Sequence, residues 1–170
     1  NALLVREAFE QVATDLRLVL VGDAPYARDY IRRVRDTRDP RVVLPGAIYG
    51  QGYKELGSHC FAYIHATEVG GTHPALLEGM GFGNCVLAND VPEHREVLED
   101  AGYFFTTSEN GDLASKMQYL LDHPEAVAGA AQKAFGKGGG QGSRSLEKRL
   151  PKPRQNRSDA CTNFLPTAGP

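Results

Sequence analysis

Short apolar runs alternate with helix-length segments along the first 135 residues, and this alternation restricts the fold more than any other feature. Residues 16–21 are apolar except for Arg17, a pattern typical of a strand that is covered on both faces. Residues 2–12 carry leucine, alanine and valine side chains near the 3.6-residue spacing of a helix. Short strands that alternate with helices predict an α/β fold with a doubly wound parallel sheet.

The same reasoning divides the whole segment into elements. The predicted strands are residues 16–21, 42–44, 61–65, 85–88 and 102–105. The predicted helices are residues 2–12, 26–35, 53–58, 74–82, 92–98, a helix capped at 110 or 112 that runs to 121, and one that opens at 124 and ends at 136. Right-handed crossovers place every strand-to-helix loop along one edge of the sheet, where α/β proteins bind ligands. The candidate ligand loops are therefore residues 22–25, 45–52 and 68–74.

Residues 68–83 form the most distinctive segment, a glycine loop that opens into a short helix. Gly70 and Gly71 allow positive φ and a close approach of the backbone to a ligand. Pro74 suits the first helical turn, so that Thr72 or His73 becomes the cap. The free N–H groups there and the positive end of the helix dipole favour a phosphate or diphosphate. His73 is open to two interpretations, a donor to phosphate or a simple cap.

One acid, Glu78, follows one turn after Pro74 on the same side of this helix. Leu76, Leu77 and Met80 form a separate apolar stripe that is predicted to face the core. A carboxylate close to a phosphate site suits ribose or sugar hydroxyls, because it accepts two hydrogen bonds. The alternative is that this segment is an ordinary capped helix that binds nothing.

Charge and cysteine content exclude several classes of protein. A net charge of −2 and a pI near 6.2 give no signature of nucleic-acid binding. There is no apolar run of membrane-spanning length, and no signal peptide precedes the first helix pattern. Cys60, Cys85 and Cys161 show neither CxxC nor dense spacing, so we expect reduced thiols and a cytoplasmic protein. The histidines lack metal-ligand spacing, so no metal site is expected.

Two boundaries are predicted. Residues 1–135 are long enough to bury a core, whereas residues 136–170 hold six Gly and four Pro, with seven Lys or Arg against two acids. Such a segment favours a disordered, solvated tail over one that touches RNA or an anionic membrane. At the other end, a doubly wound domain rarely begins with a helix. We therefore expect a strand and its loop ahead of Asn1, and a chain that is a fragment.

Five segments in the expected order resemble the nucleotide-sugar-binding, C-terminal, Rossmann-like half of retaining GT-B glycosyltransferases. These segments are Leu18-Val-Leu-Val-Gly-Asp-Ala-Pro25, Val42-Val-Leu-Pro-Gly46, residues 65–83, residues 86–98 and Ala101-Gly-Tyr-Phe-Phe105. The resemblance spans about residues 1–135 and is to the family 4-like group, which includes glycogen and sucrose synthases and mannosyltransferases. The Val-Gly-Gly-Thr-x-Pro form at residues 69–74 is similar to a branch that contains bacterial rhamnosyltransferases, enzymes of polysaccharide biosynthesis.

The resemblance implies a role for each matching position. It assigns the ribose of a donor nucleotide to Glu78, and the diphosphate to the glycine loop with the amides that begin the next helix. The nucleotide-sugar-binding positions that it implies are Gly22 and Asp23 on the cleft floor, Ala47 and Ile48 against the base, Gly70, Gly71, Thr72 and His73 at the diphosphate, and Leu77 beside Glu78. For Asp23, ordinary turn chemistry is the alternative. Bound metal is not required in this fold, and no cofactor is implied.

The chain also departs from the family pattern. The spacing of the family's paired acids places Gly70 where the first acid is usual. Glu68, slightly earlier, is the candidate catalytic side chain that would serve the transferring sugar, with a solvated loop acid as the alternative. We expect the basic residues that grip the diphosphate, and the acceptor-binding N-terminal domain, to precede Asn1. The tail does not resemble the family's closing helix, and a frameshifted or recombined reading frame would explain it.

The sequence therefore predicts a glycosyltransferase donor-binding domain of the hexosyltransferase type, which binds a nucleoside-diphosphate sugar for transfer to an acceptor hydroxyl. Catalysis would come from positioning and from amides that stabilise the leaving diphosphate, so the fragment alone should bind donor but transfer poorly. The alternative is a non-catalytic nucleotide-sugar-binding module or scaffold. An unrelated epimerase- or phosphatase-type domain is disfavoured, since the sequence has neither an early GxGxxG nor a DxD-type nucleophile. An isolated half would also expose apolar surface, so self-association is a further expectation.

Overall fold

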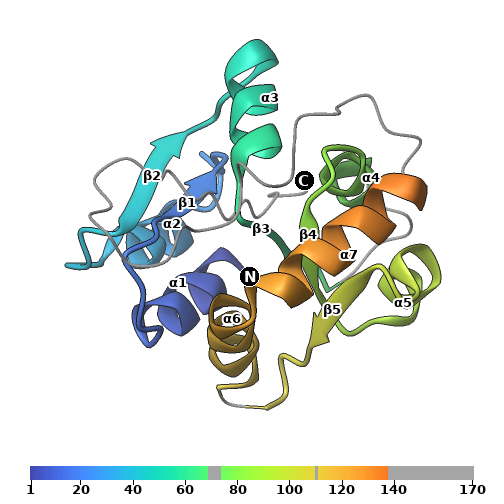
Figure 1. The fold of residues 1–170 in the computed structure, drawn as a ribbon. Coiled ribbons are helices and arrows are strands. Elements are labelled where there is room, and N and C mark those ends of the chain that lie inside the picture. Colours follow the sequence, from blue (N-terminus) through green and yellow to red (C-terminus); the bar gives the residue numbers. More distant parts are fainter. Residues whose placement is uncertain (69–73, 110, 138–170) are drawn as a thin grey trace.

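The computed structural model describes residues 1–68, 74–109 and 111–137, and within them every predicted strand and helix is present (Figure 1). The strands are β1 (Leu18–Val21), β2 (Val42–Gly46), β3 (Ala62–His65), β4 (Cys85–Asn89) and β5 (Gly102–Phe105). The helices are α1 (Ala2–Glu10), α2 (Arg28–Arg35), α3 (Gly50–His59), α4 (Pro74–Gly81), α5 (Pro92–Leu98), α6 (Asp112–Asp122) and α7 (Pro124–Lys137).

Three helices extend beyond their predicted ends: α6 by the single residue Asp122, and α3 and α7 with local contacts that stabilise the added residues. α3 begins at Gly50 rather than at residue 53, because Gln51 Nε2 donates to Glu55 Oε1 one turn later (2.6 Å) and stabilises the added turn. α7 continues past residue 136 to Lys137. The Lys137 ammonium binds Glu99 Oε2 (2.5 Å) and Asp100 Oδ1 (2.9 Å), which holds this last turn beside the end of α5. The rest of the predicted tail, residues 138–170, lies outside the described residues.

All strand pairs in the described residues are parallel, as predicted. β1 pairs with β2, and Leu18 and Val19 lie opposite Val42 and Val43. β3, β4 and β5 form a second sheet in that order. Where the sequence predicted one sheet, the described residues therefore form a two-stranded and a three-stranded sheet.

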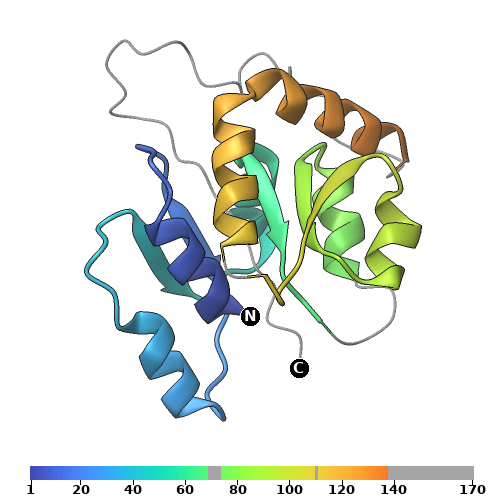
Figure 2. The same ribbon diagram turned by 90° about the horizontal axis from the view of Figure 1, so that it is seen from below.

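Alternate side chains of the strands enter two cores on opposite faces. Leu18 and Leu20 of β1 and Ala62 and Ile64 of β3 all enter the first core, so the two sheets share one covered face. Helices α1 and α6 pack together in this core (Figure 2). Tyr63 points the other way, into a second core with α4 and α5, and α7 contributes to both. Because both faces are covered, β3 and β4 are buried along their whole length, which accounts for their continuous apolar sequences.

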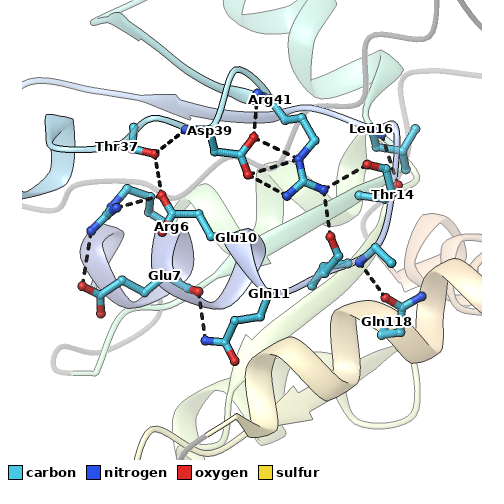
Figure 3. Close-up of polar contacts among 12 residues, drawn as sticks. Arg6, Glu7, Glu10, Gln11, Thr14, Leu16, Thr37, Asp39, Arg41 and Gln118 are labelled. Carbon is cyan, nitrogen blue, oxygen red and sulfur yellow. Dashed lines mark hydrogen bonds and ion pairs between the residues drawn. The ribbon is translucent and has the colours of Figure 1, made fainter.

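The amino ends of β1 and β2 are held by a polar network around Arg41 (Figure 3). Its guanidinium binds the Asp39 carboxylate through two nitrogens (Nε–Oδ1 3.0 Å, Nη2–Oδ2 2.6 Å). Its Nη1 donates to the backbone oxygens of Val12 (2.8 Å) and Thr14 (3.0 Å). The Cζ atom lies 4.9 Å from the centroid of the Phe9 ring on α1. One side chain thus fastens the turn between α1 and β1 to the start of β2.

The Arg41–Asp39 ion pair and a second set of hydrogen bonds, around Glu10, stabilise the amino edge of β1 and β2. The hydrogen bond from Arg41 holds the pKa of Asp39 below its ordinary value, and the same bond raises the pKa of Arg41. Arg6 Nη1 donates to Glu10 Oε1 (2.8 Å), which also accepts from the Thr37 hydroxyl (2.5 Å). α1 is therefore tied to the loop that leads into β2, and the amino edge of these strands has a structural role.

Candidate functional site

A backbone hydrogen bond joins the loops that leave the carboxyl ends of β1 and β2. The Gly22 N–H donates to the Gly46 carbonyl (3.0 Å). Both glycines have positive φ, +137° and +83°, which a residue with a Cβ adopts only with strain. The two glycines therefore fix the path of both loops, and they bring Gly22 next to the loop that carries Ala47 and Ile48.

The side chains of these two loops differ in local role and exposure. Asp23 Oδ1 accepts a hydrogen bond from the Ala24 N–H (2.8 Å), which is the turn role considered from the sequence. Ala47 is exposed and Ile48 is half-buried. Tyr49, which the sequence did not single out, is 84% exposed. The loop after β2 thus offers apolar and aromatic surface at the predicted ligand edge.

The end of β3 lies beside the start of α1. The Asn1 side-chain amide donates to the Ala66 carbonyl (2.7 Å). Burial lowers the pKa of the Asn1 amino group, and the negative charge of Glu68 opposes that shift, so Glu68 lies within electrostatic range of Asn1. Glu68 itself is exposed. The structure thus brings the candidate catalytic acid to the carboxyl edge, close to Asn1, the residue that precedes α1.

Helix α4 buries one face and exposes another. Leu76 and Met80, four residues apart, are buried as predicted, with 0% and 1% exposure. Leu77 is 45% exposed, so the prediction that it belongs to the buried stripe is wrong. Successive helical residues are turned by about 100°, which carries Leu77 off the Leu76–Met80 face. Leu77 and its neighbour Glu78 are therefore both accessible to a ligand.

Glu78 has a partner that the sequence did not indicate. The Tyr53 hydroxyl on α3 donates to Glu78 Oε2 (2.8 Å). The two residues are 25 positions apart and lie on different helices, so no local pattern in the sequence relates them. The exposed carboxylate is thereby held by a second element.

The remaining predicted site residues, Gly70, Gly71, Thr72 and His73, lie outside the described residues. The helix that follows them begins at Pro74, as predicted. Their assignment to a diphosphate stays a prediction.

Two buried histidines meet near the carboxyl ends of β3 and β4. His65 is the last residue of β3 and has 0% exposure, and its ring centroid is 4.7 Å from that of His94. His94 Nδ1 lies 2.8 Å from the Asn89 carbonyl at the end of β4. Both residues are packed in the interior.

Within the described residues, no group of three or more His, Cys, Asp or Glu side chains could hold a metal ion. No helix in the same ranges is long and apolar enough to cross a membrane.

The fold and this edge together define a Rossmann-like α/β domain whose exposed polar side chains gather at the carboxyl ends of parallel strands. Residues 1–123 match the model of the family described as glycosyl transferases group 1. The chain therefore belongs to this family of glycosyltransferases.

Solved structures of HepE from Anabaena are similar to this chain. The complex with UDP-glucose superposes with a TM-score of 0.70 at 20% sequence identity, over 86% of this chain and 40% of HepE. The complex with UDP and glucose gives the same TM-score and coverage at 21% identity. This chain thus spans about 40% of the length of HepE. The likeness confirms the predicted fold class, a Rossmann-like half of a GT-B fold. No curated protein matches the chain.

Proposed function

We propose that this chain is the donor-binding domain of a glycosyltransferase and that it binds the nucleoside diphosphate of a sugar donor. The observation that carries the proposal is the exposed carboxylate of Glu78, which lies on α4, the helix that begins at the carboxyl edge. The Tyr53 hydroxyl on α3 holds this carboxylate in place. A carboxylate there accepts two hydroxyl donors, as the ribose of a nucleotide requires. Membership of the family and the nucleotide complexes of HepE support the same ligand class.

The other site residues take roles that follow from their places around Glu78. Ala47 and Ile48, on the loop after β2, would contact the base through backbone atoms. Gly22 and Asp23, hydrogen-bonded into the adjacent turn, would form the floor of the cleft. Leu77, exposed next to Glu78, would pack against the nucleoside.

The diphosphate would be held by Gly70, Gly71, Thr72 and His73 with the amides at the start of α4. Helix amides and the positive end of the dipole favour a diphosphate without a metal ion. Glu68, on the same loop, would face the transferring sugar. Stabilisation of the leaving diphosphate by amides is the kind of electrostatic contribution that dominates many group transfers.

In the whole enzyme, a hydroxyl of the acceptor would form a new bond to C1 of the donor sugar while the bond between C1 and the phosphate oxygen breaks. The nucleoside diphosphate would leave with the electrons of that bond, and its leaving oxygen would take up the proton of the hydroxyl. The acceptor would be positioned by a further domain, because positioning supplies much of the rate in such transfers. We further propose that the enzyme transfers a hexose in bacterial polysaccharide biosynthesis and acts in the cytoplasm, as the resemblance of the Val-Gly-Gly-Thr-x-Pro segment and the sparse cysteines led us to expect.

Calorimetric titration of the 170-residue chain with UDP, dTDP, GDP and ADP, and then with the matching nucleotide sugars, tests the proposal. Glu78→Ala should lower the affinity for whichever nucleotide binds by about 10- to 100-fold, since hydrogen bonds to a charged group contribute about 1.5–3 kcal/mol. Glu96→Ala, which removes an exposed acid from α5, serves as the matched control and should leave the affinity unchanged. Absence of binding of all four nucleotides at millimolar concentration would refute the proposal.

A further inference from the structure

The contact between α3 and α4 gives Glu78 one fixed hydrogen-bond donor from among the described residues, the Tyr53 hydroxyl. Tyr53 Oη lies 2.8 Å from Oε2 of Glu78, at normal hydrogen-bonding distance. A carboxylate offers about four acceptor positions over its two oxygens. One is used by Tyr53, and the remaining positions are enough for two neighbouring hydroxyls of a ligand.

Packing holds the Tyr53 ring in place. Its centroid lies 6.3 Å from that of Phe82, with an interplanar angle of 67°, an edge-on arrangement that aromatic pairs favour. The Phe82 ring lies directly over Gly57, where an added Cβ would be 2.6 Å from two ring atoms. The Asn84 side-chain amide donates to the Gly57 carbonyl (2.9 Å). α3 is thus docked on the end of α4 by contacts one turn away from Tyr53.

The protonation of the pair suits a fixed donor and a fixed acceptor. Burial and then the hydrogen bond to Glu78 raise the pKa of Tyr53 above its ordinary value. The hydroxyl therefore keeps its proton throughout the physiological range and donates it to the carboxylate.

We propose that Tyr53 is a positioning residue that presents the Glu78 carboxylate in one rotamer to the two hydroxyls of a ribose. The inference rests on the proposed function and adds a residue to it. A free glutamate side chain loses rotamer entropy when it binds a ligand, and a side chain that Tyr53 has already ordered avoids most of that loss.

The experiment compares Tyr53→Phe with wild type, using UDP and 2′,3′-dideoxyuridine diphosphate as probes. Tyr53→Phe keeps the ring against Phe82 and removes only the hydroxyl. It should lower the affinity for UDP by about three- to tenfold, because the Glu78 side chain must then be immobilised when UDP binds. The dideoxy analogue should bind wild type and Tyr53→Phe equally, because it makes no hydrogen bond to Glu78. Tyr119→Phe, a matched loss of a hydroxyl from an exposed tyrosine on α6, should change neither affinity.

A double-mutant cycle distinguishes positioning from a structural effect. Once the carboxylate is removed in Glu78→Ala, adding Tyr53→Phe should cause less than a twofold further loss of UDP affinity, because the two residues act through one contact. An equal loss for UDP and the dideoxy analogue in Tyr53→Phe would overturn the inference and leave the proposed function standing. Failure of wild type to bind any nucleoside diphosphate would instead overturn the proposed function, and the inference with it.

Discussion

Two helical glycines with opposite surroundings give the sharpest test of the packing around the candidate site. Gly79 lies in α4, next to Glu78, and an added Cβ would be 2.7 Å from Cδ1 and 3.0 Å from Cε1 of Tyr63. Gly129 lies in α7, and nothing is within 4 Å of an added Cβ. The same substitution, Gly to Ala, therefore tests close contact at one site and open space at the other.

The magnitude follows from the contact distances. Carbon atoms pack at about 3.5–4.0 Å, so the Gly79→Ala methyl group must displace the Tyr63 ring by the better part of an ångström. Tyr63 is 1% exposed and cannot move into solvent. Overpacking of this kind costs about 1–3 kcal/mol, against about 1 kcal/mol gained from alanine in a helix. We expect Gly79→Ala to lower the free energy of unfolding by about 1 kcal/mol and Gly129→Ala to raise it by about 0.5–1 kcal/mol.

The assay is urea denaturation of both variants and wild type, followed by far-ultraviolet circular dichroism. The two variants should differ by about 2 kcal/mol with unchanged denaturant slopes, since the same surface is exposed on unfolding. If Gly79→Ala is as stable as Gly129→Ala, the close contact between α4 and β3 does not exist in solution, and the reasoning is refuted.

The remaining predictions concern the amino edge and a buried thiol. Arg41→Met should lower the free energy of unfolding by about 2–3 kcal/mol in urea denaturation, because Asp39 and two backbone carbonyls lose their donor. The control Arg32→Met, which removes an exposed ion pair, should change the free energy of unfolding by less than about 0.5 kcal/mol. Equal losses in the two variants would contradict the structural role of Arg41. Because the folded pKa of Asp39 is depressed below 3.8, its contribution is complete above that value and is lost as the pH falls through the lower folded pKa. The stability difference between wild type and Asp39→Asn should therefore shrink below pH 3.8, and a constant difference down to pH 2 would show that the ion pair does not form. Burial raises the pKa of Cys85 to about 12, so iodoacetamide at pH 8 should label it only after unfolding; native labelling at the unfolded rate, measured by peptide mass spectrometry, would contradict its burial.

The alternation of elements was predictable because burial on both faces leaves a strong mark in the sequence. Residues 85–88 are apolar without interruption, and the structure buries β4 on both faces. Helix ends were less predictable, because they depend on side-chain contacts such as that of Lys137 with Glu99. A local pattern does not contain a contact between residues 38 positions apart.

The arrangement of strands was only partly predictable. Apolar runs identify strands but not which strands share hydrogen bonds, so the division into β1–β2 and β3–β4–β5 came from the structure alone.

In the candidate site, sequence reasoning predicted Glu78 as the ligand-binding acid, a role that stays a prediction, but it did not predict the environment of Glu78. Glu78 was accessible to inference because it follows a glycine loop and a helix start. The exposure of Leu77 and the bond from Tyr53 depend on the packing of α3 against α4, which no spacing rule encodes. The roles of Gly70 and its neighbours in the loop stay predictions.

The two edges of the parallel strands have different chemistry, and this division has a consequence for mutagenesis. At the amino edge, the Arg41 guanidinium donates hydrogen bonds to one carboxylate and two backbone carbonyls, and these contacts stabilise the fold. At the carboxyl edge, Tyr26 and Tyr49 are 75% and 84% exposed, and large aromatic surface left open to water contributes little to the stability of the folded chain. Ligands of open α/β sheets bind at this same edge. Substitution at Arg41 should therefore change stability with little effect on nucleotide affinity, whereas substitution at Glu78 should do the reverse.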